Sequence, residues 1–158
     1  MIGMKTKRKL LGWMNWWPPL AGAGIRVRRM SPDFREVDVE LVQRWWNTNY
    51  VGVHFGGSLF AMTDPFYMLM LLENLGSDYI VWDKAASIRF RRPAKGTVRA
   101  EFRLTEAQIE DVRRQADANP KHEPVFTVEI KDQSGEVVSV VERTLHVKRK
   151  TGATSPTA

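Results

Sequence analysis

The stretch GGSLFAMTDPFYMLMLLENL, residues 56–75, decides how the rest of the sequence is interpreted. From Ser58 onward it is almost wholly apolar, and a helix that is apolar on all sides is a buried helix. The stretch is too short for a membrane span, and Asp64 and Pro65 interrupt it. Gly76 suits its C-terminal end. We therefore predict one long helix that is buried inside the domain.

Segments with the pattern of β-strands lie on both sides of this helix in the sequence. Alternating apolar and polar residues predict six strands, at residues 25–30, 34–41, 78–91, 97–104, 125–130 and 137–147. Thr105 and Gln108 have the spacing of a capping box, which predicts a short charged helix to about Ala118. Six strands and one wholly buried helix predict an α+β domain whose antiparallel sheet wraps around that helix.

The longest predicted strand, residues 78–91, carries an interruption in its apolar face. The residues expected to share that face are Ile80, Trp82, Ala86, Ile88 and Phe90. Lys84 falls on the same face and interrupts it.

The composition fits one globular domain that spans residues 1–158, with its core within residues 25–148. The chain is 43% hydrophobic and has neither a mid-chain linker nor an internal repeat. The absence of cysteine excludes a disulfide framework, a thiolate metal site and a cysteine nucleophile. His122 and His146 are separated by predicted strands and turns, so we expect no metal site. The net charge of +6 suits an anionic partner: nucleic acid, a membrane surface or a phosphorylated ligand.

The N-terminal twenty residues combine basic and apolar side chains. A basic run at residues 5–9 precedes an apolar stretch, as in a secretory signal, but Gly12, Asn15 and Pro18 break that stretch. One helical face would carry Leu10, Trp13, Met14 and Trp17. We predict a short helix within residues 1–20 that packs on its own domain; the alternatives are a lid over an acyl pocket and an interfacial contact with a membrane. We expect a cytoplasmic protein with a flexible tail at residues 149–158.

Residues 49–64, NYVGVHFGGSLFAMTD, resemble a motif of the hotdog-fold thioesterase superfamily, in particular the phenylacetate-pathway and small acyl-CoA thioesterases. The pattern of those enzymes is Asn-x-x-Gly, then His-Gly-Gly, then an apolar run that ends in Asp. Here Asn49 precedes Asp64 by fifteen residues, and Gly57 precedes it by seven. One departure is that Phe55 stands where the family has its histidine, and His54 lies one residue earlier.

A second segment carries the same resemblance. Residues 90–96, FRRPAKG, are similar to the family's aromatic-x-x-Pro-Ala turn between strands. The whole resemblance covers roughly residues 25–148 and extends to a poorly characterised hotdog subgroup. It implies the hotdog fold, a curved antiparallel sheet of about six strands wrapped around one long helix. It also implies hydrolysis of acyl-CoA or acyl-carrier thioesters, with coenzyme A as part of the substrate and no separate cofactor.

Thioester hydrolysis needs a group that activates water and donors that stabilise the oxyanion. Gly56 and Gly57 open the predicted helix, where backbone N–H groups have no intrahelical partner and glycine lets a ligand approach. The Gly57 amide, with Gly56, is the expected oxyanion donor; the alternative is a tight loop. The resemblance implies that Asn49 orients the carbonyl or the water, although it could instead be a turn residue.

Asp64 is the expected general base or nucleophile, a role that the resemblance implies. A carboxylate on an otherwise buried helix should have a partner, face a cavity or serve a site; the alternative is an Asp that bonds the backbone before Pro65. Seven residues of helix would place Asp64 about 10 Å from Gly57. That is too far for both to act on one carbonyl in one chain. We therefore predict a homodimer, possibly paired into a tetramer, whose sites are shared between chains.

The remaining candidates are expected to bind substrate, and they begin with His54 and Phe55 beside the two glycines. Asp83 lies ten residues before Pro93, near the place where some relatives carry a water-positioning Ser. Four basic residues could bind the phosphates of coenzyme A or a phosphopantetheine arm, namely Arg89, Arg91, Arg92 and Lys95. The alternative for these four is a solvated basic edge.

Two other functions remain open at this point. Hotdog dehydratases and hydratases use a His and an acid as a paired acid and base, which His54 and Phe55 also suggest. Their His-Phe is normally followed by Pro rather than by two glycines. A non-catalytic hotdog dimer could instead bind fatty acyl groups along a Met-rich helix. The charge alone permits nucleic-acid binding, but no recognised motif supports it, and we expect none.

Overall fold

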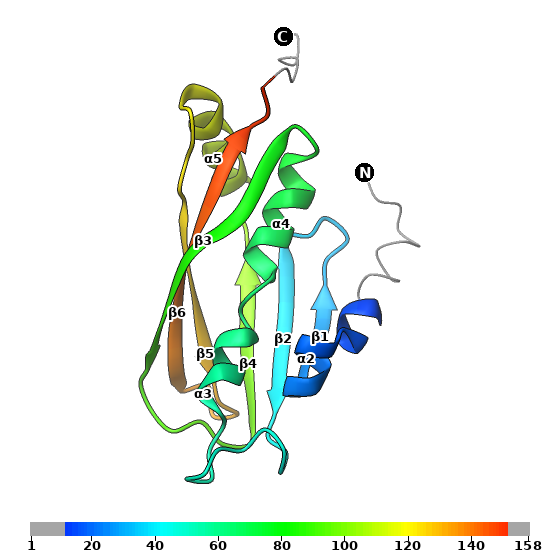
Figure 1. Ribbon diagram of the computed structural model, residues 1–158, viewed down its shortest axis with the longest axis vertical. Coiled ribbons are helices and arrows are strands. Elements are labelled where there is room, and N and C mark those ends of the chain that lie inside the picture. Colours follow the sequence, from blue (N-terminus) through cyan, green and yellow to red (C-terminus); the bar gives the residue numbers. More distant parts are fainter. Residues whose placement is uncertain (1–11, 152–158) are drawn as a thin grey trace.

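The computed structural model describes residues 12–151 and has one curved sheet at its centre (Figure 1). Its antiparallel strands lie in the order β1-β2-β4-β5-β6-β3. They are β1 (Ile25–Met30), β2 (Glu36–Val42), β3 (Tyr79–Phe90), β4 (Thr97–Arg103), β5 (Val125–Lys131) and β6 (Val137–Arg149). The helices are α2 (Pro18–Ala23), α3 (Gly56–Ala61), α4 (Phe66–Leu75) and α5 (Glu106–Ala118), and residues 12–16 are also helical. All six predicted strands are confirmed, as is the capped charged helix, with bounds that shift by a residue or two.

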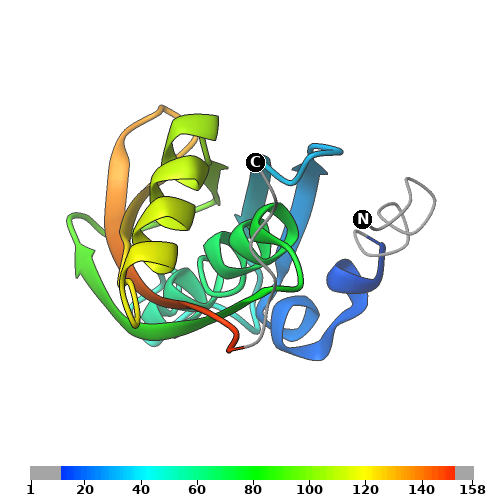
Figure 2. The ribbon, with the colours of Figure 1, turned by 90° about the horizontal axis from the view of Figure 1, so that it is seen from above.

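Alternation of apolar and polar residues explains the two faces of the sheet. In β4, Val98, Ala100 and Phe102 are buried, whereas Arg99 and Glu101 are exposed. Successive side chains on a strand point to opposite faces, so one face of each strand enters the core. The buried faces of the strands and α4 share one hydrophobic core, and the sheet curves around α4 (Figure 2). The predicted α+β architecture is confirmed.

The predicted long central helical segment is present, and it is divided into two helices at Pro65. Helix α3 ends at Ala61, and α4 begins at Phe66. Pro65 has no N–H group to continue the α-helical ladder, and the Ala61 carbonyl instead accepts from the Asp64 N–H at 3.1 Å. The expected 10 Å separation of Asp64 from Gly57 assumed an unbroken helix, so that estimate no longer applies.

Strand β3 changes its buried face at a bulge. Tyr79 and Val81 are buried in its first half, and Ile88 is half-buried in its second half. The pairing of β3 with β6 shifts between Asp83 and Ala85, which reverses the faces. Our prediction that Trp82 shares an apolar face with the later residues was therefore wrong, because Trp82 is exposed. The predicted interruption at Lys84 coincides with the bulge.

The N-terminal helical segment packs along the edge of β1. Met14 is buried in the core and Trp17 packs against it, as predicted, whereas Trp13 of the same predicted face is 58% exposed and Leu10 lies outside the described residues. The Asn15 amide covers the free edge of β1: it accepts from the Val27 N–H at 2.8 Å and donates to the Val27 carbonyl at 3.1 Å. None of the described helices is long and apolar enough to cross a membrane. The tail predicted to be flexible falls largely outside the described residues.

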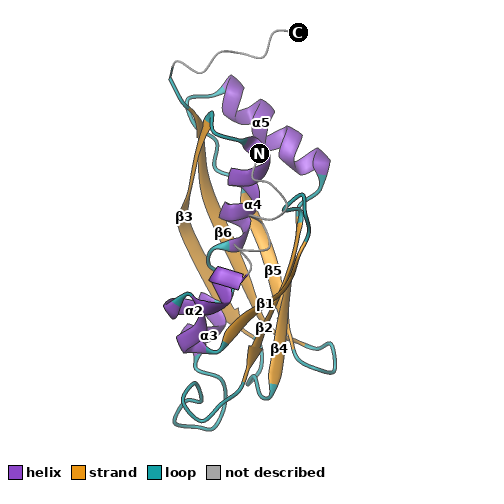
Figure 3. Ribbon diagram, turned by 90° about the vertical axis from the view of Figure 1, so that its right-hand side faces the viewer, coloured by secondary structure: helices purple, strands orange, loops and turns teal. Residues whose placement is uncertain are grey.

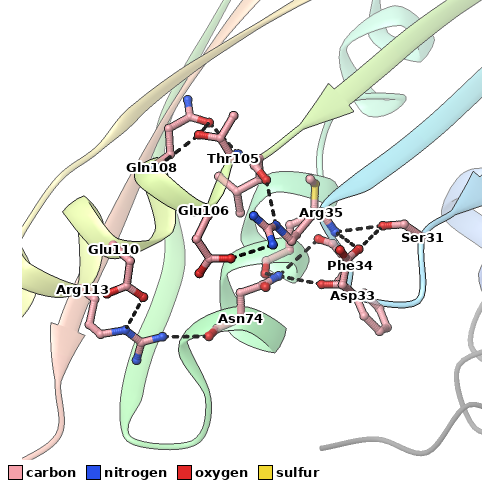
Figure 4. A network of polar contacts seen from close by, with 12 residues as sticks. Ser31, Asp33, Phe34, Arg35, Asn74, Thr105, Glu106, Gln108, Glu110 and Arg113 are labelled. Carbon is pink, nitrogen blue, oxygen red and sulfur yellow. Dashed lines mark hydrogen bonds and ion pairs between the residues drawn. The ribbon is translucent and has the colours of Figure 1, made fainter.

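The two ends of the central segment have different surroundings. Helices α2 and α3 lie next to each other at one end (Figure 3). At the C-terminal end of α4, a polar network joins α4 to α5 and to the turn after β1 (Figure 4). There Asn74 donates to the Asp33 carbonyl at 3.1 Å, Arg113 donates to the Asn74 carbonyl at 3.0 Å, and Arg35 pairs with Glu106. This network fixes the end of the molecule away from α3.

Candidate functional site

A pocket of about 460 Å³ lies between the loop that precedes α3 and the connection that follows β3. Phe90 and Leu59 supply apolar walls. The pocket brings together five of the site residues predicted from the sequence, namely Asn49, His54, Gly56, Arg91 and Arg92. The two segments that carried the resemblance, 49–64 and 90–96, therefore lie against each other.

Asn49 organises the loop that carries the motif. Its Oδ1 accepts from the N–H groups of Val51 and Val53, each at 3.1 Å, and its Nδ2 lies 3.4 Å from the His54 carbonyl. These are the bonds of a turn residue, the alternative considered for this position. The amide nevertheless borders the pocket, so its position is compatible with contact to a ligand.

His54 is buried and ties the motif loop to the connection between β3 and β4. Its Nε2 lies 2.8 Å from the Gly96 carbonyl, and its backbone N–H donates to the Ala94 carbonyl at 2.9 Å. Because a carbonyl only accepts, Nε2 carries the proton, and Nδ1 is buried with no hydrogen-bond partner among residues 12–151. Burial lowers the pKa of His54, and the bond to Gly96 only partly opposes that effect. The imidazole is therefore held neutral.

The two glycines make room for aromatic rings. A Cβ atom on Gly56 would lie 3.0 Å from the Phe90 ring, and one on Gly57 would lie 2.3 Å from the Phe55 ring. Glycine therefore allows both rings to approach the backbone at the start of α3. Phe55 itself is largely exposed. Any substrate that reached the Gly57 amide would meet the Phe55 ring beside it.

The basic residues near the pocket differ in how their charges are used. Arg92 is paired with Glu136 and lies 3.6 Å from Asp132, both next to the turn between β5 and β6. Arg89, Arg91 and Lys95 are exposed and form no ion pair with the described residues. Three of the four predicted phosphate-binding residues therefore retain an unpaired charge.

Asp64 lies in the break between α3 and α4 and is bound by a buried arginine. Arg143 Nη1 donates to Asp64 Oδ1 at 2.7 Å, and the Arg143 side chain is only 3% exposed. The second guanidinium nitrogen of Arg143 lies 3.3 Å from Thr63 Oγ1 and 3.4 Å from the Phe60 carbonyl. The Asp64 side chain is 60% exposed in the single chain, and it has a charged partner, one of the three arrangements expected for a carboxylate at this position. The break at Pro65 accounts for this exposure, because Asp64 is no longer inside a buried helix.

Asp83 is a second carboxylate beside the same arginine. Its Oδ1 lies 3.6 Å from Arg143 Nη1 and is buried without a hydrogen bond to any residue that the structure describes. Burial raises the pKa of Asp83, Arg143 opposes the rise, and the negative charge of Asp64 adds to it. Arg143 therefore holds together two carboxylates with different environments, one exposed and one half-buried.

Arg143 did not emerge from the sequence as a site residue, although a signal was present. In β6, Val141, Leu145 and Val147 are buried on the face that enters the core. Arg143 occupies the same face, between Val141 and Leu145. A charged residue on the buried face of an alternating strand requires a partner. That pattern could have marked Arg143 as the partner of a carboxylate.

Within one chain the candidates form two groups. Asn49, His54 and Gly56 border the pocket, whereas Asp64 and Asp83 surround Arg143 and do not line it. A family model described as a domain of unknown function, DUF4442, matches residues 6–147. The chain belongs to the DUF4442 family. No curated protein matches it.

Several solved structures share the fold of this DUF4442 protein. A probable thioesterase of unknown function from Pseudomonas aeruginosa, PA5026, superposes with a TM-score of 0.79 at 24% identity, over 94% of this chain and 97% of that one. Thioesterase HI1161 from Haemophilus influenzae has a TM-score of 0.64 at 16% identity, over 90% and 94% of the two chains. The PaaI protein of the E. coli phenylacetic acid degradation operon has a TM-score of 0.61 at 16% identity, over 97% and 100%.

These comparisons confirm the hotdog fold. The family description also agrees with the poorly characterised subgroup to which the motif pointed.

Proposed function

We propose that this protein hydrolyses the thioester bond of an acyl-CoA or acyl-carrier substrate, with Asp64 as general base or nucleophile. The observation that carries the proposal is the exposed Asp64 carboxylate, whose Oδ1 lies 2.7 Å from the buried guanidinium of Arg143. A charged partner fixes one carboxylate oxygen and leaves the other available to a water molecule or a carbonyl carbon. Asp64 is thus oriented and accessible at once.

In the general-base form of the reaction, Asp64 takes a proton from a water molecule whose oxygen attacks the thioester carbonyl carbon. The negative charge that develops on the carbonyl oxygen is stabilised by the Gly57 amide, the donor suggested by the motif. The carbon–sulfur bond then breaks. The thiol leaves with the proton that Asp64 had accepted, and the acid product retains the water oxygen.

The pocket beside α3 supports a substrate that combines an apolar and an anionic part. Phe90 and Leu59 offer apolar contacts, and Arg91 borders the same pocket and forms no ion pair within the described part of the chain. Arg89 and Lys95 lie near it in the sequence and are exposed. Phosphates of coenzyme A or of a phosphopantetheine arm are the anions that these three charges would bind.

We further propose that two copies pair through β3 to complete the site. Strand β3 is an edge strand of twelve residues, and Ala85, Ala86 and Ser87 in its middle are exposed. A long unprotected edge is a template for pairing with another strand. Asp83 and Phe90 are seven residues apart, but the bulge after Asp83 leaves six steps of the ladder between them, or about 20 Å along the strand.

A two-fold axis midway between these two residues would place Asp83 of one copy opposite Phe90 of the other. Phe90 borders the pocket and Asp83 lies beside Arg143, so this register would bring the two half-sites together.

The test is a screen of acyl-CoA substrates of increasing chain length with the wild type and Asp64→Asn, assayed by release of free thiol. We expect hydrolysis by the wild type and a loss of at least about a hundredfold in kcat for the variant, as for removal of an essential base. The matched control is Asp111→Asn, an exposed carboxylate on α5 that should leave the rate unchanged.

Equal rates for wild type and Asp64→Asn would refute the proposed role of Asp64. Enoyl-CoA hydration without hydrolysis would favour a hydratase, and acyl-CoA binding without turnover would favour a carrier. Acyl-carrier substrates run in parallel would identify the thiol donor.

A further inference from the structure

An exposed aromatic and basic surface lies on the N-terminal helical segment, β1 and the loop after β2. Four tryptophans are exposed on it, with Trp16 at 83% and Trp45 at 86%. We define the tryptophan–arginine surface as Trp13, Trp16, Trp45, Trp46, Arg26 and Arg44. None of these residues lines the pocket beside α3.

Residues from three elements meet on this surface. A hollow of about 540 Å³ is bordered by Trp16 and Trp46 and by the side chains of Arg26 and Arg44. Arg28 also borders it, but that guanidinium is paired with Glu40. Arg26 and Arg44 form no ion pair with any described residue, so two positive charges stand free beside two indole rings.

The charge on the described part of the surface is predominantly positive. Residues 12–32 contain three arginines and no Asp or Glu, and residues 41–63 contain Arg44 and no acidic residue. Glu40 lies opposite Arg26 in the register of β1 and β2, but its carboxylate is bonded to Arg28 and Arg99, so the potential of the surface stays positive. The surface is therefore complementary to a dense array of negative charges.

The surface is held rigidly by bonds to the sheet. Asn47 is buried, and its Nδ2 donates to the Ala23 carbonyl at 3.0 Å and to the Val42 carbonyl at 2.9 Å. It thereby joins the loop that carries Trp45 and Trp46 to the end of α2. Asn15 fixes the helical segment that carries Trp13 and Trp16 to the edge of β1. Since the backbone is fixed on both sides, exposure of the four indoles is built into the fold.

We propose that the tryptophan–arginine surface docks on an anionic lipid bilayer. Indole side chains favour the interface between water and hydrocarbon, and arginines beside them attract anionic headgroups. Single-stranded nucleic acid would need a basic groove that follows the backbone. Here the four exposed indoles outnumber the two free arginines, which favours an interface that takes up apolar groups. The protein would lie on the bilayer through this surface and leave the β3 edge free.

The test is co-sedimentation of the full chain with vesicles of phosphatidylcholine, with and without phosphatidylserine. We expect binding only to vesicles that contain phosphatidylserine, and weaker binding in high salt. Arg26→Ala/Arg44→Ala should bind about thirtyfold more weakly, from roughly a kilocalorie per mole for each basic residue. The control Arg114→Ala/Lys148→Ala removes the same charge from exposed positions elsewhere and should bind like the wild type.

A second variant, Trp16→Ala/Trp46→Ala, tests the contribution of the indole side chains to binding. Brominated lipids should quench the tryptophan fluorescence of the wild type, and this quenching should be lost in the variant. The proposal is overturned if the wild type binds neither kind of vesicle, or if the arginine variant and its control weaken equally. Binding of a single-stranded oligonucleotide without binding of vesicles would also overturn it. Thioesterase assays are not involved, so failure here leaves the proposed hydrolase unaffected.

Discussion

Replacement of Arg143 by Met removes the charge that joins the two carboxylates while keeping a long side chain in the core. The guanidinium is 3% exposed, lies 2.7 Å from Asp64 and 3.6 Å from Asp83, and its carbon stands 4.9 Å from the centre of the Phe60 ring. Met is flexible enough to fill most of the vacated space. The principal loss on substitution is therefore electrostatic.

The expected cost is about 3 kcal/mol of unfolding free energy at neutral pH. Breaking a buried ion pair by removal of one partner costs roughly 3–5 kcal/mol. Asp64 is 60% exposed, and solvent would compensate most of its loss, as for surface pairs worth below about 1 kcal/mol. Asp83 is half-buried, so most of the loss in stability comes from its uncompensated charge. The total is therefore expected at the lower end of this range, about 3 kcal/mol. For a domain of this size the melting temperature should fall by about 9 °C.

The measurement is urea unfolding followed by circular dichroism at one fixed protein concentration, since dimer formation would make stability depend on concentration. Asp83→Asn in the Arg143→Met background should recover at least about 1 kcal/mol, because the uncompensated charge is then gone. The exposed Arg114→Met serves as the control. A change of less than about 0.5 kcal/mol for Arg143→Met, or no recovery in the double variant, would refute the assignment of a buried charge pair.

Two further predictions concern the β3 edge and His54. Ala86→Arg should convert the proposed dimer to a monomer in size-exclusion chromatography with light scattering and should abolish the proposed hydrolysis, because the two added positive charges would lie close to each other beside the two-fold axis. A folded, active monomer would contradict shared sites. Burial lowers the pKa of His54. As the pH falls below about 6.5, the unfolded chain therefore takes up a proton that the folded chain does not, and stability that is present above this pH should be lost. The loss of unfolding free energy is at most about 1.4 kcal/mol per pH unit. Thermal unfolding of the wild type and of His54→Gln at pH 7, 6 and 5 measures it, and the variant should lose less stability as the pH falls. The same dependence of stability on pH in both proteins would exclude the effect.

The strands and the charged helix could be predicted because each is specified by neighbours in the sequence. In β4, alternation of Val98, Ala100 and Phe102 with charged residues is sufficient to place the buried face. Thr105 and Gln108 form the expected capping box, in which each side chain bonds the other residue's backbone. These interactions span a few residues, and tertiary contacts reinforce them rather than oppose them.

The helix break and the β3 bulge were harder to predict from the sequence, because each requires a choice between local alternatives. Pro65 predicts a disturbed helix, but a kink and a complete break differ only in how residues 62–64 pair with the preceding turn. Lys84 marks an interruption of β3, yet the sequence does not say whether the strand ends there or inserts one residue and continues. Pairing with β6 resolves that choice, and β6 lies about fifty residues later in the chain.

The environment of Asp64 depends on contacts that no local pattern contains. Asp64 and Arg143 are 79 residues apart, and Asp83 joins them from a third element. The motif identifies the carboxylate, and the alternation of buried and exposed residues along β6 places Arg143 on the buried face. Only the fold brings the two side chains together. A charge that must be paired and a carboxylate that must be oriented satisfy each other here. This is why the same arginine should matter for both the stability of the core and the orientation of the proposed base.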